Sequence, residues 1–175
     1  MKIKDITRIS LCVALLCITS YLVIPLPFSP AVIGIQTILV NIIGLMFQPK
    51  QAGLTVFIYL LMGLIGLPVF SAGTSGPGKL FGPTGGFYVG FLAAVLLISV
   101  LKGKKNSFEQ YCMVLIGAGL TVQHAFAILF MCIYNGGNIG AAFLTMSLPF
   151  ILGDVIKCVI SAWLGTVLNR TLQRI

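Results

Sequence analysis

Charged residues are scarce in this sequence of 175 residues. Only 8% of the chain is Asp, Glu, Lys or Arg, whereas 58% is hydrophobic, and the mean hydropathy is +1.10. Soluble domains carry about a quarter charged residues, so this composition excludes an ordinary soluble domain and is typical of a membrane protein. A membrane span needs roughly 20 apolar residues, which leaves room for about six helices in one domain over residues 1–175.

Residues for metal binding or nucleophilic catalysis are also few. The single histidine, His124, has no histidine or cysteine at ligand spacing, so we expect neither a metal site nor a Ser–His–Asp arrangement, and no cofactor. His124 is interpreted as a hydrogen-bonded core residue, with a proton relay as the alternative. The five cysteines lie in apolar segments without paired spacing, which excludes a disulfide framework.

The apolar runs predict an all-α membrane protein with six transmembrane helices. Their approximate ranges are 9–24, 31–47, 52–67, 84–101, 108–134 and 147–173. Prolines mark several boundaries, because each pushes the preceding residue out of helical geometry. Pro25 ends the first run, Pro68 closes the third, and Ser147 before Pro149 resembles a helix start. Residues 25–30 are predicted to form a stiff, extended turn.

The lysine and arginine residues indicate the orientation of the chain. With an even number of spans, both termini and the second and fourth loops lie on one side. That side holds nine basic residues, namely Lys2, Lys4, Arg8, Lys50, Lys102, Lys104, Lys105, Arg170 and Arg174. The opposite side holds only Lys79. This asymmetry predicts that both termini are cytoplasmic, and it accounts for the net charge of +8 without a nucleic-acid partner.

A glycine-rich stretch, residues 71–90, separates the third and fourth apolar runs. It contains seven glycines and two prolines. Glycine at this density lets the backbone approach a ligand or another helix closely, although a structured turn between two helices would explain it equally well. Part of the stretch resembles a phosphate-binding loop. Leu80 replaces the hydroxyl residue that holds magnesium, so nucleotide binding is not expected.

Two ionisable residues, Asp154 and Lys157, interrupt the last apolar run. An ionisable residue at the centre of a membrane helix costs about 2.5–3.5 kcal/mol on insertion scales, so it indicates a functional site by default. An ion pair that merely neutralises itself is the alternative. The two residues share a helix face roughly 10 Å below the outer end, which predicts a pocket open to the outside. Gln36 and Thr37, near the outer end of the second run, either line this pocket or bond a neighbouring helix.

Several motifs, in this order and spacing, resemble the BioY family. They are Ile24-Pro-Leu-Pro-Phe28, Gln36-Thr37, Gly66-Leu-Pro-Val-Phe70, Gly82-Pro-Thr-Gly-Gly86 and Pro149-Phe-x-x-Gly-Asp-x-x-Lys157. Members of this family are the biotin-specific substrate-binding (S) components of energy-coupling-factor (ECF) transporters. The resemblance covers nearly the whole chain. It implies a six-helix S-component in a bacterial plasma membrane that captures biotin from outside. It also implies a transmembrane coupling subunit and two cytoplasmic ATPase subunits as partners.

Biotin suits the pocket that the residues predict. Its ureido ring offers two N–H donors and one carbonyl acceptor, which match a carboxylate and a donor such as lysine or glutamine. The predicted ligand-binding residues are Gln36, Thr37, Lys79, Gly82, Thr84, Gly85, Gly86, Phe87, Tyr88, Asp154 and Lys157. The expected aromatic walls are Phe28, Phe70, Phe81, Phe87 and Tyr88.

Two further surfaces are predicted, a lid and a coupling face. The turn residues Pro25, Leu26, Pro27 and Phe28 are predicted to act as a lid. The second surface is the coupling face, for which the resemblance implies Ser10 and Ala14 on the first helix. In the family this face often shows alanines four apart, whereas in this chain the series is Ser10, Ala14 and Ile18.

Two alternative functions would use the same ionisable residues. A membrane enzyme with Asp154 as base or nucleophile would lack a second acid or a metal. A proton or ion pathway through Asp154, His124 and Lys157 would have no acidic continuation toward the cytoplasm.

Overall fold

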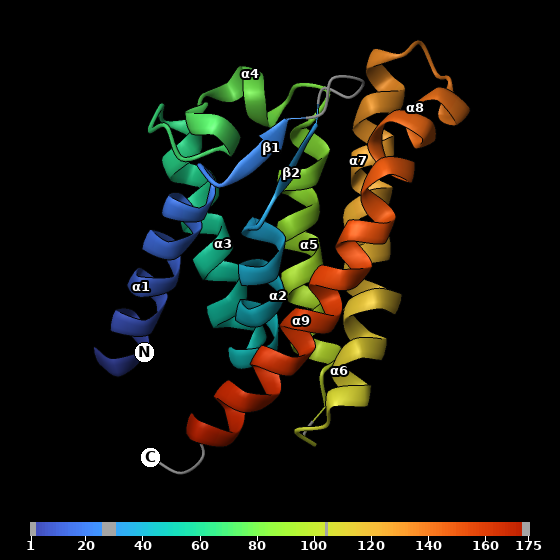
Figure 1. Ribbon diagram of the computed structural model, residues 1–175. Coiled ribbons are helices and arrows are strands. Elements are labelled where there is room, and N and C mark those ends of the chain that lie inside the picture. The colour runs from blue at the N-terminus through green and yellow to red at the C-terminus, as the bar shows by residue number, and fades with distance from the viewer. Residues whose placement is uncertain (1–2, 26–30, 104, 173–175) are drawn as a thin grey trace.

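The computed structural model describes residues 3–25, 31–103 and 105–172, and this part of the chain is mostly helical. The elements in chain order are α1 (Ile3–Thr19), β1 (Val23–Pro25), β2 (Val32–Gly34), α2 (Gln36–Met46), α3 (Pro49–Leu64), η1 (Ser71–Gly73), α4 (Pro77–Leu80), α5 (Gly85–Leu101), α6 (Phe108–Val114), η2 (Leu115–Leu120), α7 (Thr121–Tyr134), α8 (Ile139–Met146) and α9 (Leu148–Leu172). The longer helices run side by side along one axis (Figure 1).

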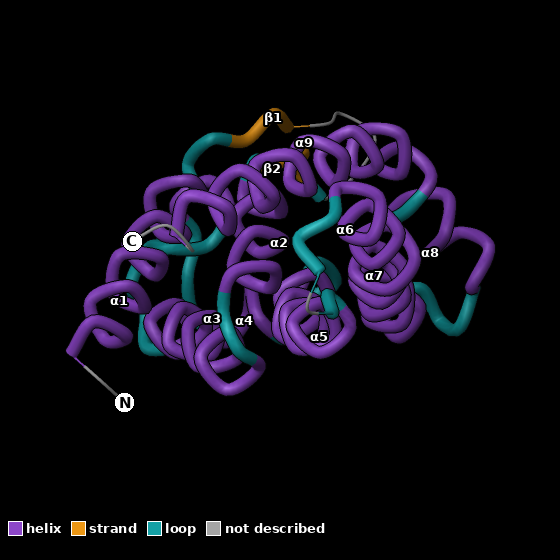
Figure 2. Tube along the Cα trace, turned by 90° about the horizontal axis from the view of Figure 1, so that it is seen from below, coloured by secondary structure: helices purple, strands orange, loops and turns teal. Residues whose placement is uncertain are grey.

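Helix α5 is the central helix of the bundle. It packs against α2, α3 and α7, whereas α1 lies at the outer edge beside α3 (Figure 2). Helix α1 begins and α9 ends at one end of the bundle, which we call the terminal end (Figure 1). The β1–β2 hairpin, α4 and α8 lie at the other end, which we call the loop end. The loops that the sequence assigned to one side of the membrane are therefore grouped at one end of the bundle.

Two segments of the described chain are long and apolar enough to cross a membrane, Phe108–Tyr134 and Leu148–Thr171. The helices Gln36–Met46 and Gly85–Leu101 are apolar but shorter. The segment Phe108–Tyr134 contains a π-helical stretch, η2, between α6 and α7. The wider π-turn changes the rotational phase of the residues that follow it, and such turns are frequent at functional sites.

The first and second apolar runs are not helical to their predicted boundaries. Helix α1 ends at Thr19 and α2 begins at Gln36, because part of the chain between them forms the antiparallel strands β1 and β2. Both strands contain β-branched residues, which pack well on a pleated surface. Pro25 occupies the end of β1, where a sheet tolerates the missing N–H donor. The all-α prediction is therefore confirmed only as a mostly helical fold with one short hairpin.

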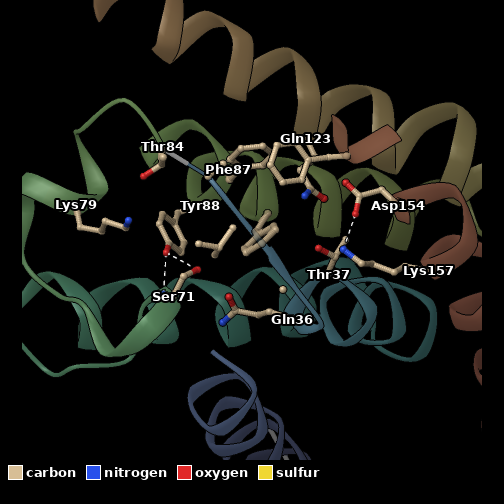
Figure 3. A pocket seen from close by; sticks show the side chains of 15 residues that line it. Gln36, Thr37, Ser71, Lys79, Thr84, Phe87, Tyr88, Gln123, Asp154 and Lys157 are labelled. Atoms are coloured by element: carbon tan, nitrogen blue, oxygen red, sulfur yellow. Dashed lines mark hydrogen bonds and ion pairs between the residues drawn. The ribbon is translucent and has the colours of Figure 1, made fainter. Parts of the chain in front are cut away.

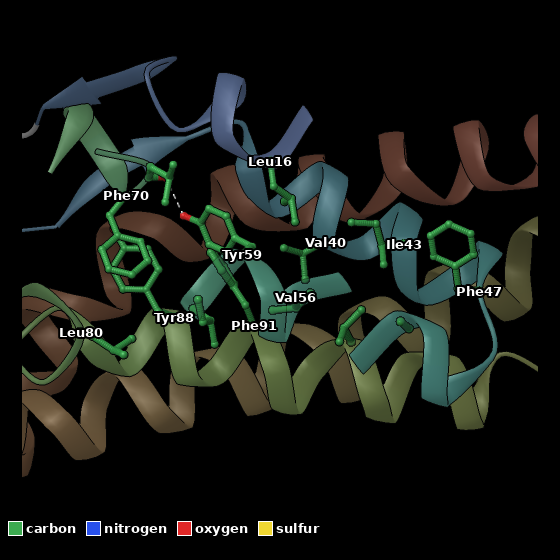
Figure 4. Packing of buried hydrophobic residues seen from close by; sticks show 14 residues of the cluster. Leu16, Val40, Ile43, Phe47, Val56, Tyr59, Phe70, Leu80, Tyr88 and Phe91 are labelled. Atoms are coloured by element: carbon green, nitrogen blue, oxygen red, sulfur yellow. Dashed lines mark hydrogen bonds between the residues drawn. The ribbon is translucent and has the colours of Figure 1, made fainter. Parts of the chain in front are cut away.

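Aromatic side chains fill the core between α3 and α5 (Figure 4). The ring of Phe70 is fully buried, with its centroid 4.5 Å from that of Tyr88 and 5.8 Å from that of Tyr59. The Tyr59 hydroxyl donates a hydrogen bond of 3.0 Å to the carbonyl of Val69. These contacts fix the chain that follows α3 against the bundle.

The close approach of α5 to α7 depends on two glycines. A Cβ at Gly86 would lie 2.2 Å from the carbonyl oxygen of Phe126, and one at Gly90 would lie 3.0 Å from the Cα of Gln123. The obstructing atoms belong to the backbone of α7, so they cannot rotate away as a side chain would. Glycine at these positions therefore sets the distance between the two helices.

We expect Gly86→Ala to lower the free energy of unfolding by about 1–3 kcal/mol, because the added methyl group must push α5 away from α7. The measurement is thermal unfolding of the purified protein in detergent. Gly153→Ala is the matched control, since a Cβ at this position in α9 meets nothing within 4 Å and alanine favours a helix. Equal melting temperatures for Gly86→Ala and the unchanged protein would contradict this account of the α5–α7 contact.

Candidate functional site: a polar pocket at the loop end

A pocket lies at the loop end, between β2 and the adjacent parts of α2, α5, α7 and α9. Its lining residues are Ala31, Val32, Gly34, Gln36, Thr37, Ser71, Lys79, Thr84, Phe87, Tyr88, Phe91, Gln123, Phe150, Asp154 and Lys157 (Figure 3). The space between them measures about 560 Å³, including the part open to solvent. The mixture of apolar and polar walls is typical of small-molecule sites.

The most buried charge in the pocket is the carboxylate of Asp154, a residue that is 5% exposed. Lys157, one turn further along α9, donates from Nζ to its Oδ1 over 2.7 Å. On the other side, Nε2 of His124 on α7 lies 3.1 Å from its Oδ2. The carboxylate is therefore held from two helices.

The second nitrogen of His124, Nδ1, lies 2.9 Å from the Ser147 hydroxyl. A neutral imidazole with its proton on Nε2 satisfies both contacts, since Nε2–H donates to the carboxylate and Nδ1 accepts from the hydroxyl. Asp154 and Lys157 then balance each other in charge. A carboxylate has about four acceptor positions, so Asp154 can still accept hydrogen bonds from a ligand.

Ser147, His124 and Asp154 form a Ser–His–Asp chain that the sequence analysis did not expect. Spacing along the sequence could not reveal it, because His124 on α7 meets Ser147 and Asp154 only in the fold. Ser147 is 1% exposed and is absent from the pocket lining, so its hydroxyl cannot reach a bound molecule. The chain orients Asp154, and the interpretation of His124 as a hydrogen-bonded core residue is confirmed.

Lys79 lies at the end of the pocket away from the Asp154–Lys157 pair (Figure 3). Partial burial lowers the pKa of this ammonium group below its usual range. Between the two ends, the Tyr88 hydroxyl donates to Ser71 Oγ over 2.9 Å and accepts from the Ser71 N–H over 3.0 Å. The pocket thus has a hydrogen-bonding end at Asp154 and a cationic end at Lys79.

Eight of the eleven predicted ligand-binding residues line this pocket, namely Gln36, Thr37, Lys79, Thr84, Phe87, Tyr88, Asp154 and Lys157. Both expectations for Gln36 apply, because it lines the pocket and its Nε2 also donates to the Leu16 carbonyl over 3.0 Å. The three glycines Gly82, Gly85 and Gly86 are not in the lining. They allow close backbone contacts instead; a Cβ at Gly85, for example, would lie 1.9 Å from the Leu80 carbonyl oxygen.

Seven lining residues were not predicted, namely Ala31, Val32, Gly34, Ser71, Phe91, Gln123 and Phe150. Gln123 had a sequence signal, because it is an uncharged polar residue inside an apolar run. Two expected aromatic walls are elsewhere, since Phe70 is buried in the core and Phe81 is 59% exposed. Within the described ranges, no three His, Cys, Asp or Glu residues are grouped so that they could hold a metal ion.

The whole chain is similar to known proteins. The BioY family model matches residues 1–174. The "Biotin transporter BioY2" of Lactococcus lactis subsp. cremoris (strain MG1363) is 30% identical over 174 residues, which cover 98% of this chain and 93% of that protein. The "Biotin transporter BioY" of Thermotoga maritima is 30% identical over 167 residues, which cover 95% of this chain and 96% of that protein.

A solved structure has the same fold. It is described as the S-component for biotin from an ECF-type ABC transporter, and its TM-score to this chain is 0.86 at 25% sequence identity. The match covers 96% of this chain and 92% of that one. The family match over nearly all residues and this shared architecture agree with each other. The chain belongs to the BioY family.

Proposed function

We propose that this protein binds biotin in the loop-end pocket and takes part in its uptake as the substrate-specific S component of an ECF-type transporter. The observation that carries the proposal is the buried Asp154 carboxylate, held by Lys157 and His124 at the wall of a pocket with aromatic and polar lining residues. Membership of a family whose relatives are named biotin transporters supports it. Biotin is the transported ligand in this role, and the protein is not an enzyme.

The ureido ring of biotin fits the end of the pocket at Asp154. The carboxylate can accept one of its N–H groups, and the Lys157 ammonium can donate to its carbonyl oxygen. The apolar thioether ring and valeryl chain can pack on the nearby aromatic walls, Phe87, Phe91 and Phe150.

The carboxylate of biotin needs a cation elsewhere, because Asp154 and Lys157 balance each other. Lys79 supplies a full positive charge at the opposite end of the same pocket (Figure 3). The N-terminus of α5 at Thr84, Gly85 and Gly86 is the competing source, with about half a charge. We favour Lys79, since Gly85 and Gly86 are absent from the pocket lining.

The loop end is proposed to face the outside of the cell and the terminal end the cytoplasm. Among the described residues, the basic side chains belonging to segments at the terminal end are Lys4, Arg8, Lys50, Lys102, Lys105 and Arg170. Lys79 in α4 is at the loop end. This is the distribution of a protein with cytoplasmic termini. Biotin would then enter the pocket from outside.

Six membrane crossings are proposed for this single domain in a bacterial plasma membrane: α1, β2 with α2, α3, α5, α6 with α7, and α9. Helix α2 has only 11 residues, which span about 16 Å at 1.5 Å per residue, less than the roughly 30 Å of hydrocarbon. The hairpin and the pocket occupy the remaining depth at its outer end.

Helix α1 is the proposed contact with a transmembrane coupling subunit, which in turn would bind two cytoplasmic ATPase subunits. Ser10 and Ala14 are both exposed on this helix, which lies at the edge of the bundle (Figure 2). Exposed Leu11 and Ile18 lie on the same helix. Small and apolar residues of this kind favour close helix packing in a membrane.

The lid also stays a proposal. Val32 and Gly34 of β2 line the pocket, and β1 pairs with β2, so the hairpin borders the pocket. Pro25 is the exposed last residue of β1, whereas Leu26, Pro27 and Phe28 lie outside the described residues.

We expect Asp154→Ala to weaken biotin binding by about 3–5 kcal/mol, or roughly a hundredfold to several thousandfold, because it removes the acceptor and leaves Lys157 unpaired in a desolvated site. Asp154→Asn should be milder. The measurement is isothermal titration of biotin into protein purified in detergent. Glu109→Ala, an exposed acidic residue of α6, is the control and should bind as the unchanged protein does. An unaltered dissociation constant in folded Asp154→Ala would refute the site.

We expect Lys79→Ala to weaken biotin by about 1–3 kcal/mol while biotinamide, which lacks the carboxylate, is barely affected. Because burial lowers the pKa of Lys79, biotin affinity should also fall as the pH rises through that lowered value and the ammonium loses its proton. The comparison of both ligands on both proteins is the measurement. Equal losses for the two ligands would favour the N-terminus of α5 instead.

A further inference from the structure

We infer that Gln123 is a further ligand-contacting residue, one that selects the neutral ureido ring; this inference rests on the proposed function. Gln123 is 4% exposed and lines the pocket, and no hydrogen bond joins its side-chain amide to another of the described residues. Figure 3 shows this amide turned into the pocket on the side of Asp154. Among the described residues, the one fully buried side-chain polar atom without a partner is Asn106 Oδ1, so the Gln123 amide is open to the pocket. A ligand in the pocket can therefore exchange hydrogen bonds with it.

The backbone of Gln123 is held from two directions. Gly90 of α5 brings the helices so close that a Cβ there would lie 3.0 Å from both the Cα and the carbonyl oxygen of Gln123. The next residue, His124, is fixed by its bonds to Asp154 and Ser147. The preceding π-helical stretch, η2, sets the rotation that directs both polar residues into the bundle. The backbone of Gln123 is thus fixed before a ligand binds, which lowers the entropic cost of binding.

The chemistry of the ureido group leaves a role for this amide. Each Asp154 oxygen already has one protein partner, Lys157 for Oδ1 and His124 for Oδ2. A ureido ring has an N–H on each side of its carbonyl. The two N–H groups point in diverging directions, so one carboxylate beside the ring accepts only one of them. The Oε1 of Gln123 can accept the second N–H, while Lys157 donates to the carbonyl oxygen.

An amide at this position also explains selectivity for a neutral ring. In 2-iminobiotin a guanidinium group, positively charged at neutral pH, replaces the ureido group. Gln123 offers it no negative charge, and the carboxylate of Asp154 is already balanced by Lys157. A carboxylate at position 123 would instead attract the guanidinium through charge-assisted hydrogen bonds.

The test titrates biotin and 2-iminobiotin into Gln123→Leu, Gln123→Glu and the unchanged protein in detergent. Gln123→Leu should bind biotin about 10- to 100-fold more weakly, because one ureido N–H loses its acceptor. Gln123→Glu should raise the affinity for 2-iminobiotin relative to biotin by about tenfold or more. This second result is a gain, so loss of folding cannot imitate it. Gln51→Leu and Gln51→Glu, at the start of α3 away from the pocket, are the matched controls and should match the unchanged protein.

Unchanged biotin affinity in Gln123→Leu, or an unchanged ratio of the two ligands in Gln123→Glu, would overturn the inference while leaving the proposed function intact. Failure of the unchanged protein and of the Gln51 controls to bind biotin would overturn the proposed function itself, and the inference with it.

Discussion

The ion pair between Asp154 and Lys157 is the interaction on which the site depends. Removing two charges from water costs several kcal/mol per ion, and their attraction repays this only with good geometry and further hydrogen bonds. His124 supplies such a bond from a second helix, and Ser147 in turn orients His124. Apolar residues could fill the same volume without this desolvation cost. A buried, hydrogen-bonded pair at the wall of a pocket is therefore best explained by a ligand that it recognises.

Helix packing determines whether this pair can form a pocket. Glycines at positions 86 and 90 let α5 approach the backbone of α7, and the π-helical stretch before Thr121 sets the rotation of α7. On the other side, the aromatic cluster around Phe70 fixes the chain that leads to Ser71 and Tyr88. The glycines of the glycine-rich stretch thus mainly allow close packing, and the stretch contributes the side chains of Ser71, Lys79, Thr84, Phe87 and Tyr88 to the pocket lining.

Local patterns in the sequence predicted the parts of the site that lie on single segments. The i, i+3 spacing placed Asp154 and Lys157 on one face of a helix, and the mostly helical class followed from the apolar runs. The contact of His124 with Asp154 could not be predicted, because it joins residues 30 positions apart, on α7 and α9, that meet only in the fold. The hairpin was missed because its strands are three residues long and lie within apolar runs of helical length. The contact of Gly86 with α7 could not be predicted, because glycine allows close approach to a ligand and to a helix alike.

The most direct test of the central claim is mass spectrometry of the protein purified in detergent from cells grown with biotin. The account predicts that biotin remains bound through purification, and that protein stripped of it takes up added biotin. Folded, monodisperse protein that carries no biotin and takes up none on addition would contradict the account.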